Sequence, residues 1–201
     1  MQYGIAVCGL LGLAVLAHAG PNLVANPGFE TGDFTNWSFA AASCGSDFGV
    51  TTNPVDAHTG NFAAFFAGTC AGSYDSFEQT LATTPADSYD ISFWIDTMSS
   101  GSDVRDLQVF WNGNLILDLP GPGTNTYQEY VFNDEAATGS TAVLEFRGYN
   151  PQTDFVDDVS VVDNAASVPE TGTSLLLFVG LGLVLIRGLV PRRTRADSDT
   201  P

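Results

Sequence analysis

Hydrophobic and polar residues alternate in short runs along the middle of the chain. Between Tyr89 and Asp96 apolar residues occupy every second position, a period of two that is typical of a β-strand with one buried face. A similar run at 107–111 is followed by Asn112-Gly113, a dipeptide that tolerates positive φ and forms tight hairpin turns. The same criteria predict further strands at 62–66, 76–81, 115–117, 127–132, 141–147 and 154–162.

These strands define one domain over residues 20–164. No part of it has a sustained helical period, and about eight short strands in this length are typical of two sheets packed face to face. The predicted fold is therefore all-β, a two-sheet antiparallel jelly-roll sandwich. A domain near this size buries about two-thirds of its unfolded surface, so a true hydrophobic core is expected.

The first 19 residues have the pattern of a secretory signal peptide. An apolar run from Gly4 to Ala17 leads into the small-x-small sequence Ala17-His18-Ala19, which predicts cleavage after Ala19. No Lys or Arg precedes the run, and a retained membrane helix is the alternative. At about 14 residues the apolar run is short for a membrane span, which favours cleavage.

The C-terminal end predicts a second membrane segment. A stalk and short motif at 165–174 precede an apolar segment at 175–190, which predicts a single transmembrane helix. The arginines that follow it are expected to hold residues 191–201 on the cytoplasmic side as a basic tail.

The motif in this tail resembles a known class of bacterial sorting signals. Val168, Pro169, Glu170, Thr171 and Gly172, followed by a short span and an Arg cluster, are similar to the PEP-CTERM class in its Val-Pro-Glu/Asp-Thr-Gly variant. The resemblance implies processing by an exosortase-like membrane protease in a Gram-negative bacterium that makes exopolysaccharide. The protein would be exported, held briefly in the inner membrane, and then released to the cell surface or extracellular matrix. The motif is also similar to the Leu-Pro-x-Thr-Gly signal of Gram-positive sortases, which remains the alternative.

The charge of the chain narrows the choice of partners. There are 23 acidic and 6 basic residues, a net charge of −17, and the predicted domain has Arg105 and Arg147 as its only Lys or Arg residues. Such a field excludes nucleic acid as a partner and suits divalent cations. The alternative for most of the carboxylates is a solvated acidic surface.

Two cysteines remain after removal of the predicted signal peptide. Cys44 and Cys70 form an even pair in an exported chain, which predicts one disulfide. The chain-entropy model assigns a loop of this size about 3 kcal/mol of stabilisation. A reactive or metal-binding pair is the alternative.

Three segments give the domain a second resemblance. Residues 22–32 with Trp37, residues 58–63 and residues 155–161 are similar, in this order, to galactose-binding-like jelly rolls, which include several carbohydrate-binding modules. The resemblance implies a structural calcium ion between the first and last strands. Carried over by motif, its ligands would be Glu30 and Asp157, with Asp158 as a further candidate.

Calcium prefers six to eight hard oxygen ligands, which carboxylates and backbone carbonyls supply. The alternative is that Asp157 and Asp158 are ordinary acids at a strand end.

Two aromatic residues lie out of phase with the core-facing positions of their strands. Trp94 and Phe110 are candidates to stack against sugar rings. The alternative is that loops or the other sheet cover them. Trp37 and Trp111 are assigned to the core.

Motifs of catalysis are scarce in this sequence. His58 is the single histidine of the predicted domain, and we find no nucleophile elbow, phosphate-binding loop or dinucleotide-binding turn. We therefore expect a non-enzymatic protein of the bacterial envelope or matrix whose domain contacts extracellular polysaccharide. A secreted glycan-active enzyme and a structural surface protein without a soluble ligand remain the alternatives.

Overall fold

A computed structural model describes residues 20–99 and 104–164. The predicted signal peptide, the stalk with its sorting motif, the transmembrane helix and the basic tail lie outside the described residues. Within the two described ranges, no helix combines the length and the apolar character that crossing a membrane requires.

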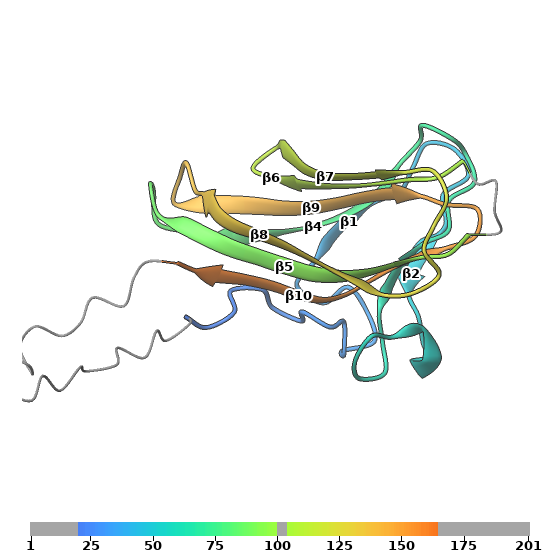
Figure 1. Ribbon diagram of the computed structural model, residues 1–201, viewed down its shortest axis with the longest axis horizontal. Helices are drawn as coiled ribbons and strands as arrows, with labels where there is room; N and C mark the ends of the chain where they lie inside the picture. Colours follow the sequence, from blue (N-terminus) through green and yellow to red (C-terminus); the bar gives the residue numbers. More distant parts are fainter. Residues whose placement is uncertain (1–19, 100–103, 165–201) are drawn as a thin grey trace, which may run out of the picture. The chain divides into compact units, whose positions relative to one another are not determined.

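The described residues form two antiparallel sheets of five strands each, stacked as two layers (Figure 1). The first, called the β10 sheet, has the order β2 (Phe48–Val50), β3 (Ala64–Phe66), β10 (Asp154–Asp163), β5 (Ser88–Thr97) and β8 (Gln128–Ala136). The second, called the β9 sheet, has the order β1 (Ser38–Ala40), β4 (Asp75–Ala82), β9 (Thr141–Tyr149), β6 (Asp106–Trp111) and β7 (Asn114–Pro120). One 3-10 turn, η1 (Pro54–Asp56), lies in the loop between β2 and β3. The predicted two-sheet jelly-roll sandwich is confirmed.

The predicted strands agree with the observed ones, and two strands were missed. The eight predicted runs correspond to β3 to β10, and Asn112 and Gly113 form the predicted turn with φ of 50° and 75°. The missed strands, β1 and β2, have only three residues each, and none of their residues is fully buried. A strand this short at a sheet edge has no period to detect.

The core is rich in aromatic rings that join the two sheets. Phe77 of β4 stacks on Phe66 of β3 with ring centroids 5.0 Å apart, and Phe93 of β5 meets Phe146 of β9 edge-on at 5.1 Å. Trp37 and Trp111 are both buried, as predicted. Such rings combine a large buried area with preferred stacked or edge-on geometry, so they hold the layers in register.

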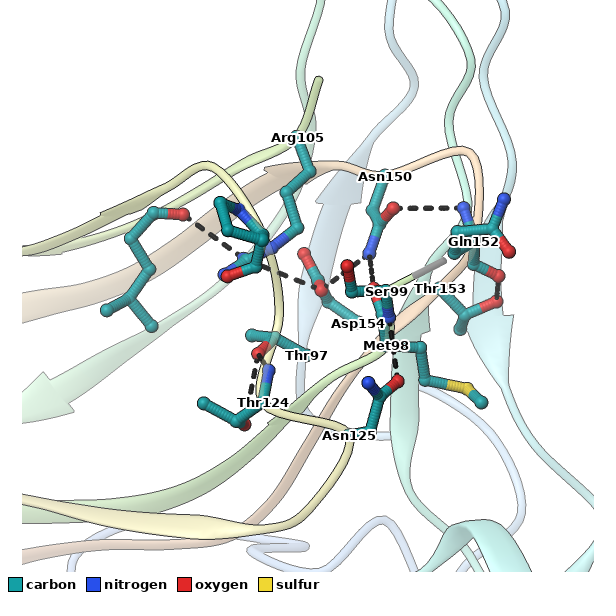
Figure 2. A network of polar contacts seen from close by, with 12 residues as sticks. Thr97, Met98, Ser99, Arg105, Thr124, Asn125, Asn150, Gln152, Thr153 and Asp154 are labelled. Carbon is teal, nitrogen blue, oxygen red and sulfur yellow. Dashed lines mark hydrogen bonds and ion pairs between the residues drawn. The ribbon is translucent and has the colours of Figure 1, made fainter. Parts of the chain in front are cut away.

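A buried polar network ties the sheets together at one end of the sandwich (Figure 2). The guanidinium of Arg105, which is 5% exposed, lies 3.7 Å from the carboxylate of the fully buried Asp154 on β10. Arg105 also donates to the carbonyl oxygens of Leu119 and Pro122, and Asn150 donates to Asp154 at 2.8 Å. Burial raises the pKa of Asp154 to about 7, although Arg105 and Asn150 act in the opposite direction.

Candidate functional site

The outer face of the β9 sheet carries two adjoining hollows, together called the outer-face groove. The larger, of about 410 Å³, lies between the loop residues 41–43, the segment 72–74 and the side chains of Ser76, Glu145 and Arg147. The smaller, of about 230 Å³, is lined by β1 together with Ser76, Glu78 and Glu145. The two hollows share Ser76 and Glu145, so the groove runs from the edge strand β1 toward the centre of the sheet.

Strand register arranges the outward side chains in two rows across the sheet. In one row Ser76, Arg147 and Gln108 lie opposite one another on β4, β9 and β6. In the other row Glu78, Glu145 and Phe110 lie opposite one another on the same three strands. Side chains opposite one another in antiparallel strands project from the same face and interact. The register therefore brings these polar residues and one ring into a single surface.

The centre of this surface is a preorganised arginine. The guanidinium of Arg147 donates two hydrogen bonds to the carboxylate of Glu145, at 2.7 and 2.8 Å, and lies 4.5 Å from the centre of the Phe110 ring. The hydrogen bonds from Arg147 to Glu145 raise the pKa of Arg147. Two-point pairing and cation–π contact both fix the orientation of a guanidinium plane. The arginine therefore covers one side of the predicted sugar-contacting ring.

A second polar cluster lies beside the groove. The Tyr74 hydroxyl, which lines the larger hollow, donates to Asp106 at 2.6 Å, and the Gln108 amide donates to the same carboxylate oxygen at 3.1 Å. Burial raises the pKa of both Asp106 and Tyr74. These contacts hold Tyr74 in one orientation at the wall of the groove.

The loop that walls the groove is anchored at two points. The predicted disulfide between Cys44 and Cys70 is present, and it joins the loop before β2 to the loop before β4. The fully buried Asp75 carboxylate accepts hydrogen bonds from the backbone N–H groups of Ala42 and Asp47, at 2.7 and 3.0 Å. The groove therefore has a wall that is fixed by covalent and charge-assisted contacts.

The outer face of the β10 sheet is different because the loop 53–62 lies over it. His58 of this loop stacks on Trp94 with ring centroids 3.8 Å apart and an angle of 14° between the planes. The Tyr127 hydroxyl holds the loop by donating to the Asp56 carbonyl oxygen at 2.6 Å. Trp94 is thus half-buried under the protein's own imidazole ring.

The predicted calcium ligands come together at the edge of this covered face. Asp157 and Asp158 each place an oxygen within 3.5 Å of the position that a Cβ would occupy at Gly28, and the Glu30 side chain lies 3.7 Å from the same point. A side chain at Gly60 would collide with the Glu30 carboxylate. The missing side chains of Gly28 and Gly60 therefore leave room for the side chains of Asp157, Asp158 and Glu30.

A β-bulge explains how two neighbouring aspartates can face the same loop. The pairing of β10 with β5 is irregular between Asp157 and Ser160, and Asp158 has a φ of 49°. Bulges re-aim side chains that would otherwise alternate between the two faces. As a result Asp157 accepts from the backbone N–H groups of His58 and Thr59, at 2.8 and 3.1 Å, while Asp158 pairs with the His58 imidazole at 2.6 Å.

The carboxylates of this cluster already accept hydrogen bonds from the protein itself. Burial raises the pKa of Asp157 to about 6, although backbone hydrogen bonds oppose the shift. Glu30 accepts from the backbone N–H groups of Asn61 and Phe62, at 2.9 and 3.2 Å. In residues 20–99 and 104–164 no three His, Cys, Asp or Glu side chains are arranged to hold a metal ion. Calcium at Glu30, Asp157 and Asp158 stays a prediction, and the carboxylate oxygens that Asp157 and Asp158 place near Gly28 are of the kind that calcium prefers.

The architecture defines a fold class, the jelly-roll β-sandwich, as the sequence resemblance implied. No protein-family model matches the sequence, and no curated protein matches it either.

Solved structures show the likeness in fold. A carbohydrate-binding module, TmCBM61, in complex with β-1,4-galactotriose has a TM-score of 0.55 at 20% identity, covering 72% of this chain and 100% of its own. The CBM22-1 xylan-binding domain from Paenibacillus barcinonensis Xyn10C has a TM-score of 0.51 at 17% identity, covering 75% of this chain and 99% of its own. The K3 cleaved adhesin domain of Lys-gingipain from Porphyromonas gingivalis has a TM-score of 0.54 at 13% identity, covering 72% of this chain and 99% of its own.

The structure separates the two aromatic residues that the sequence nominated together. Trp94 belongs to the β10 sheet and Phe110 to the β9 sheet, and each is half-buried beside fully buried neighbours, so they project from opposite outer faces. Sequence reasoning missed Tyr74, Glu78, Glu145 and Arg147 as groove residues. The positions of Glu78, Glu145 and Arg147 in the predicted strands indicated that they face outward, but their cross-strand partners depend on register. Tyr74 precedes the predicted strand 76–81 and had no such signal.

Proposed function

We propose that this protein is an exported, non-enzymatic component of a bacterial envelope or extracellular matrix that binds polysaccharide through the outer-face groove. The observation that carries the proposal is that Arg147, which lines a groove of hydroxyls and carboxylates, is held over the ring of Phe110 beside that groove. Sugar recognition needs flat surfaces for the ring faces and several oriented polar groups for the hydroxyls.

The fold supports this assignment as an analogy. The groove crosses a sheet of a jelly roll that is similar to a galactotriose-binding module and to a xylan-binding domain. A shared fold does not determine function, so the proposal depends on the groove residues themselves.

The hydrogen bonds of the acidic residues in the groove also favour a binding role. Both oxygens of Glu145 accept hydrogen bonds from Arg147, so this carboxylate is already engaged within the protein. His58, the single histidine of the domain, stacks on Trp94 of the other sheet. We assign binding rather than glycan cleavage to the groove for these reasons.

The two ends of the chain supply the delivery route in this proposal. The signal peptide directs export, and the motif Val168–Gly172 with the following span and basic tail directs processing by an exosortase-like protease. A structural calcium ion at Glu30, Asp157 and Asp158 would fix the loop 53–62 against β10, and its role would be stability rather than chemistry.

A glycan array probed with the full chain in mild detergent tests the function. We expect retention on a subset of polysaccharides, reduced at least about tenfold by Arg147→Ala because the guanidinium and the orientation of the Phe110 ring are lost together. Trp94→Ala should leave that retention unchanged. Release of reducing sugar from a retained glycan would support an enzyme instead, and retention on no glycan would contradict the proposal.

A further inference from the structure

The outer-face groove has an unbalanced charge. Glu78 and Glu145 lie directly opposite each other on β4 and β9, and Arg147 is the cation beside them. Like charges directly opposite in adjacent strands destabilise a sheet. Because Glu145 already neutralises Arg147, one negative charge remains, on Glu78.

The Glu78 carboxylate is the acidic group of the groove that is available to a ligand. It lines the smaller hollow, is half-buried, and makes no hydrogen bond or ion pair within the described parts of the chain. Two further carboxyl groups, Asp106 and Asp118, lie beside the groove, where they accept hydrogen bonds from Tyr74 and Gln108. A ligand that brings a positive charge to Glu78 would offset its negative charge and would supply the missing hydrogen bonds.

The cations of the described residues are each engaged by one of the protein's own carboxylates. Arg105 is buried against Asp154, and His58 is paired with Asp158 on the other face of the sandwich. Arg147 donates from Nε and from one of its two Nη groups to Glu145. A polysaccharide of uronic acids would therefore meet uncompensated carboxylates in the groove.

We infer that the outer-face groove selects a polysaccharide that carries free amino groups. This inference rests on the proposed function, because it names the class of glycan that the groove would bind. An ammonium group at a sugar ring offers three hydrogen-bond donors and a positive charge to Glu78. Hydrogen bonds between ionised partners are about twice as strong as those between neutral groups. The adjoining sugar ring lies against the Arg147–Phe110 stack, and its hydroxyls reach Ser76 and Tyr74.

Isothermal titration of the full chain in mild detergent with three hexasaccharides tests this inference. The probes are glucosamine, N-acetylglucosamine and galacturonic acid oligomers, compared at about pH 6, where the amine is protonated. We expect the glucosamine oligomer to bind at least about tenfold more tightly than its N-acetylated form, and the galacturonate oligomer not to bind. Raising the salt concentration should weaken the glucosamine complex and leave the N-acetylated one unchanged.

Two isosteric variants distinguish specific binding at Glu78 from a general attraction of the cationic oligomer to an acidic protein. Glu78→Gln should lower the affinity for the glucosamine oligomer about tenfold and leave that for the N-acetylated oligomer unchanged. Glu129→Gln, an exposed position on β8 of the other sheet, is the matched control and should change neither. Equal losses in both variants would show general charge attraction and would overturn the inference.

The remaining outcomes distinguish the inference from the function on which it rests. If neutral glycans bind to the groove and the glucosamine oligomer binds no better, the inference is wrong and the proposed function stands. If no glycan of any class binds, both are wrong.

Discussion

Each outer face of the sandwich presents one aromatic side chain that is out of phase with the core-facing positions of its strand. The two side chains differ in what covers them. On the β9 sheet Phe110 is stacked by Arg147, which comes from the neighbouring strand and leaves a groove beside it. On the β10 sheet Trp94 is stacked by His58, which comes from a loop that lies over the sheet. An identical sequence signal therefore has two outcomes, and the loops decide between them.

The acidic residues differ between the faces in the same way. On the covered face Asp157 and Glu30 accept hydrogen bonds from backbone N–H groups, so they hold a loop in place. On the open face Glu145 pairs with a side chain, whereas the Glu78 carboxylate makes no hydrogen bond to any residue in the ranges 20–99 and 104–164. We therefore assign stability to the first set of carboxylates and recognition to the second.

The largest expected effect comes from breaking the frame that both faces share. Arg105→Ala leaves the Asp154 carboxylate buried without its cation, and we expect the free energy of unfolding to fall by about 3–5 kcal/mol in urea titrations. Both faces should be lost in the same transition. The double variant Arg105→Met with Asp154→Asn should recover part of the loss, and no recovery would contradict this explanation.

Removal of the disulfide should separate the faces. Cys44→Ser with Cys70→Ser should cost about 3 kcal/mol of stability by the chain-entropy estimate. Because the disulfide supports the wall of the groove, glycan binding should weaken at temperatures where the domain is still folded. The NMR signal of the Trp94 indole N–H, which reports the covered face, should not change under those conditions. A parallel loss of both signals would show that the disulfide acts on the whole domain.

The covered face should depend on pH and on calcium. The pKa of Asp157 in the folded state, about 6, lies above the ordinary value of 3.8, so the folded protein holds the extra proton between these values. The stability contributed by this group is therefore greatest at low pH and decreases as the pH rises from about 4 to about 6.

Calcium should oppose that decrease because it binds the ionised carboxylate. At a free concentration a hundredfold above its dissociation constant it adds about 2.7 kcal/mol. Thermal unfolding between pH 4 and 8, with calcium or with EDTA, measures both effects, and Asp157→Asn isolates the share of this residue. Identical profiles with calcium and EDTA would rule out the calcium proposal.

The smallest expected effect on stability is at the open face. Arg147 is partly exposed, with 42% of its side chain accessible, and surface ion pairs contribute about 0.2–1 kcal/mol. Arg147→Ala should therefore change the free energy of unfolding by less than about 1 kcal/mol while it removes glycan retention. A loss of stability much larger than this would mean that the Arg147–Glu145 pair is a structural element rather than a recognition element.

Strand positions and the disulfide could be predicted from the sequence because they depend on local period and on cysteine count. The calcium assignment to Glu30, Asp157 and Asp158 came from the family resemblance and stays a prediction. The sequence gives no sign of the bulge at Asp157 or of the left-handed backbone at Asp158, because aspartate is tolerated in both regular and bulged strands. Without the bulge the two carboxylates would face opposite sides of β10.

The groove could not be predicted for a related reason. Glu145 and Arg147 sit two residues apart on one strand, but the ring under Arg147 comes from β6, which is more than 30 residues earlier in the chain. A shift of one residue in the pairing of β6 with β9 would place Phe110 against a core-facing position. Register is set by the whole sheet, so the candidate site became visible only in the folded structure.

The difference between the two faces can be tested most directly by mapping amide chemical shifts in the full chain in mild detergent while a retained glycan is added. The account predicts changes at Ser76, Glu145 and Arg147, with no change at Thr59, Asp158 or the indole N–H of Trp94. Changes centred on Trp94 and the loop 53–62 would contradict it, because they would show that the covered face is the one that binds.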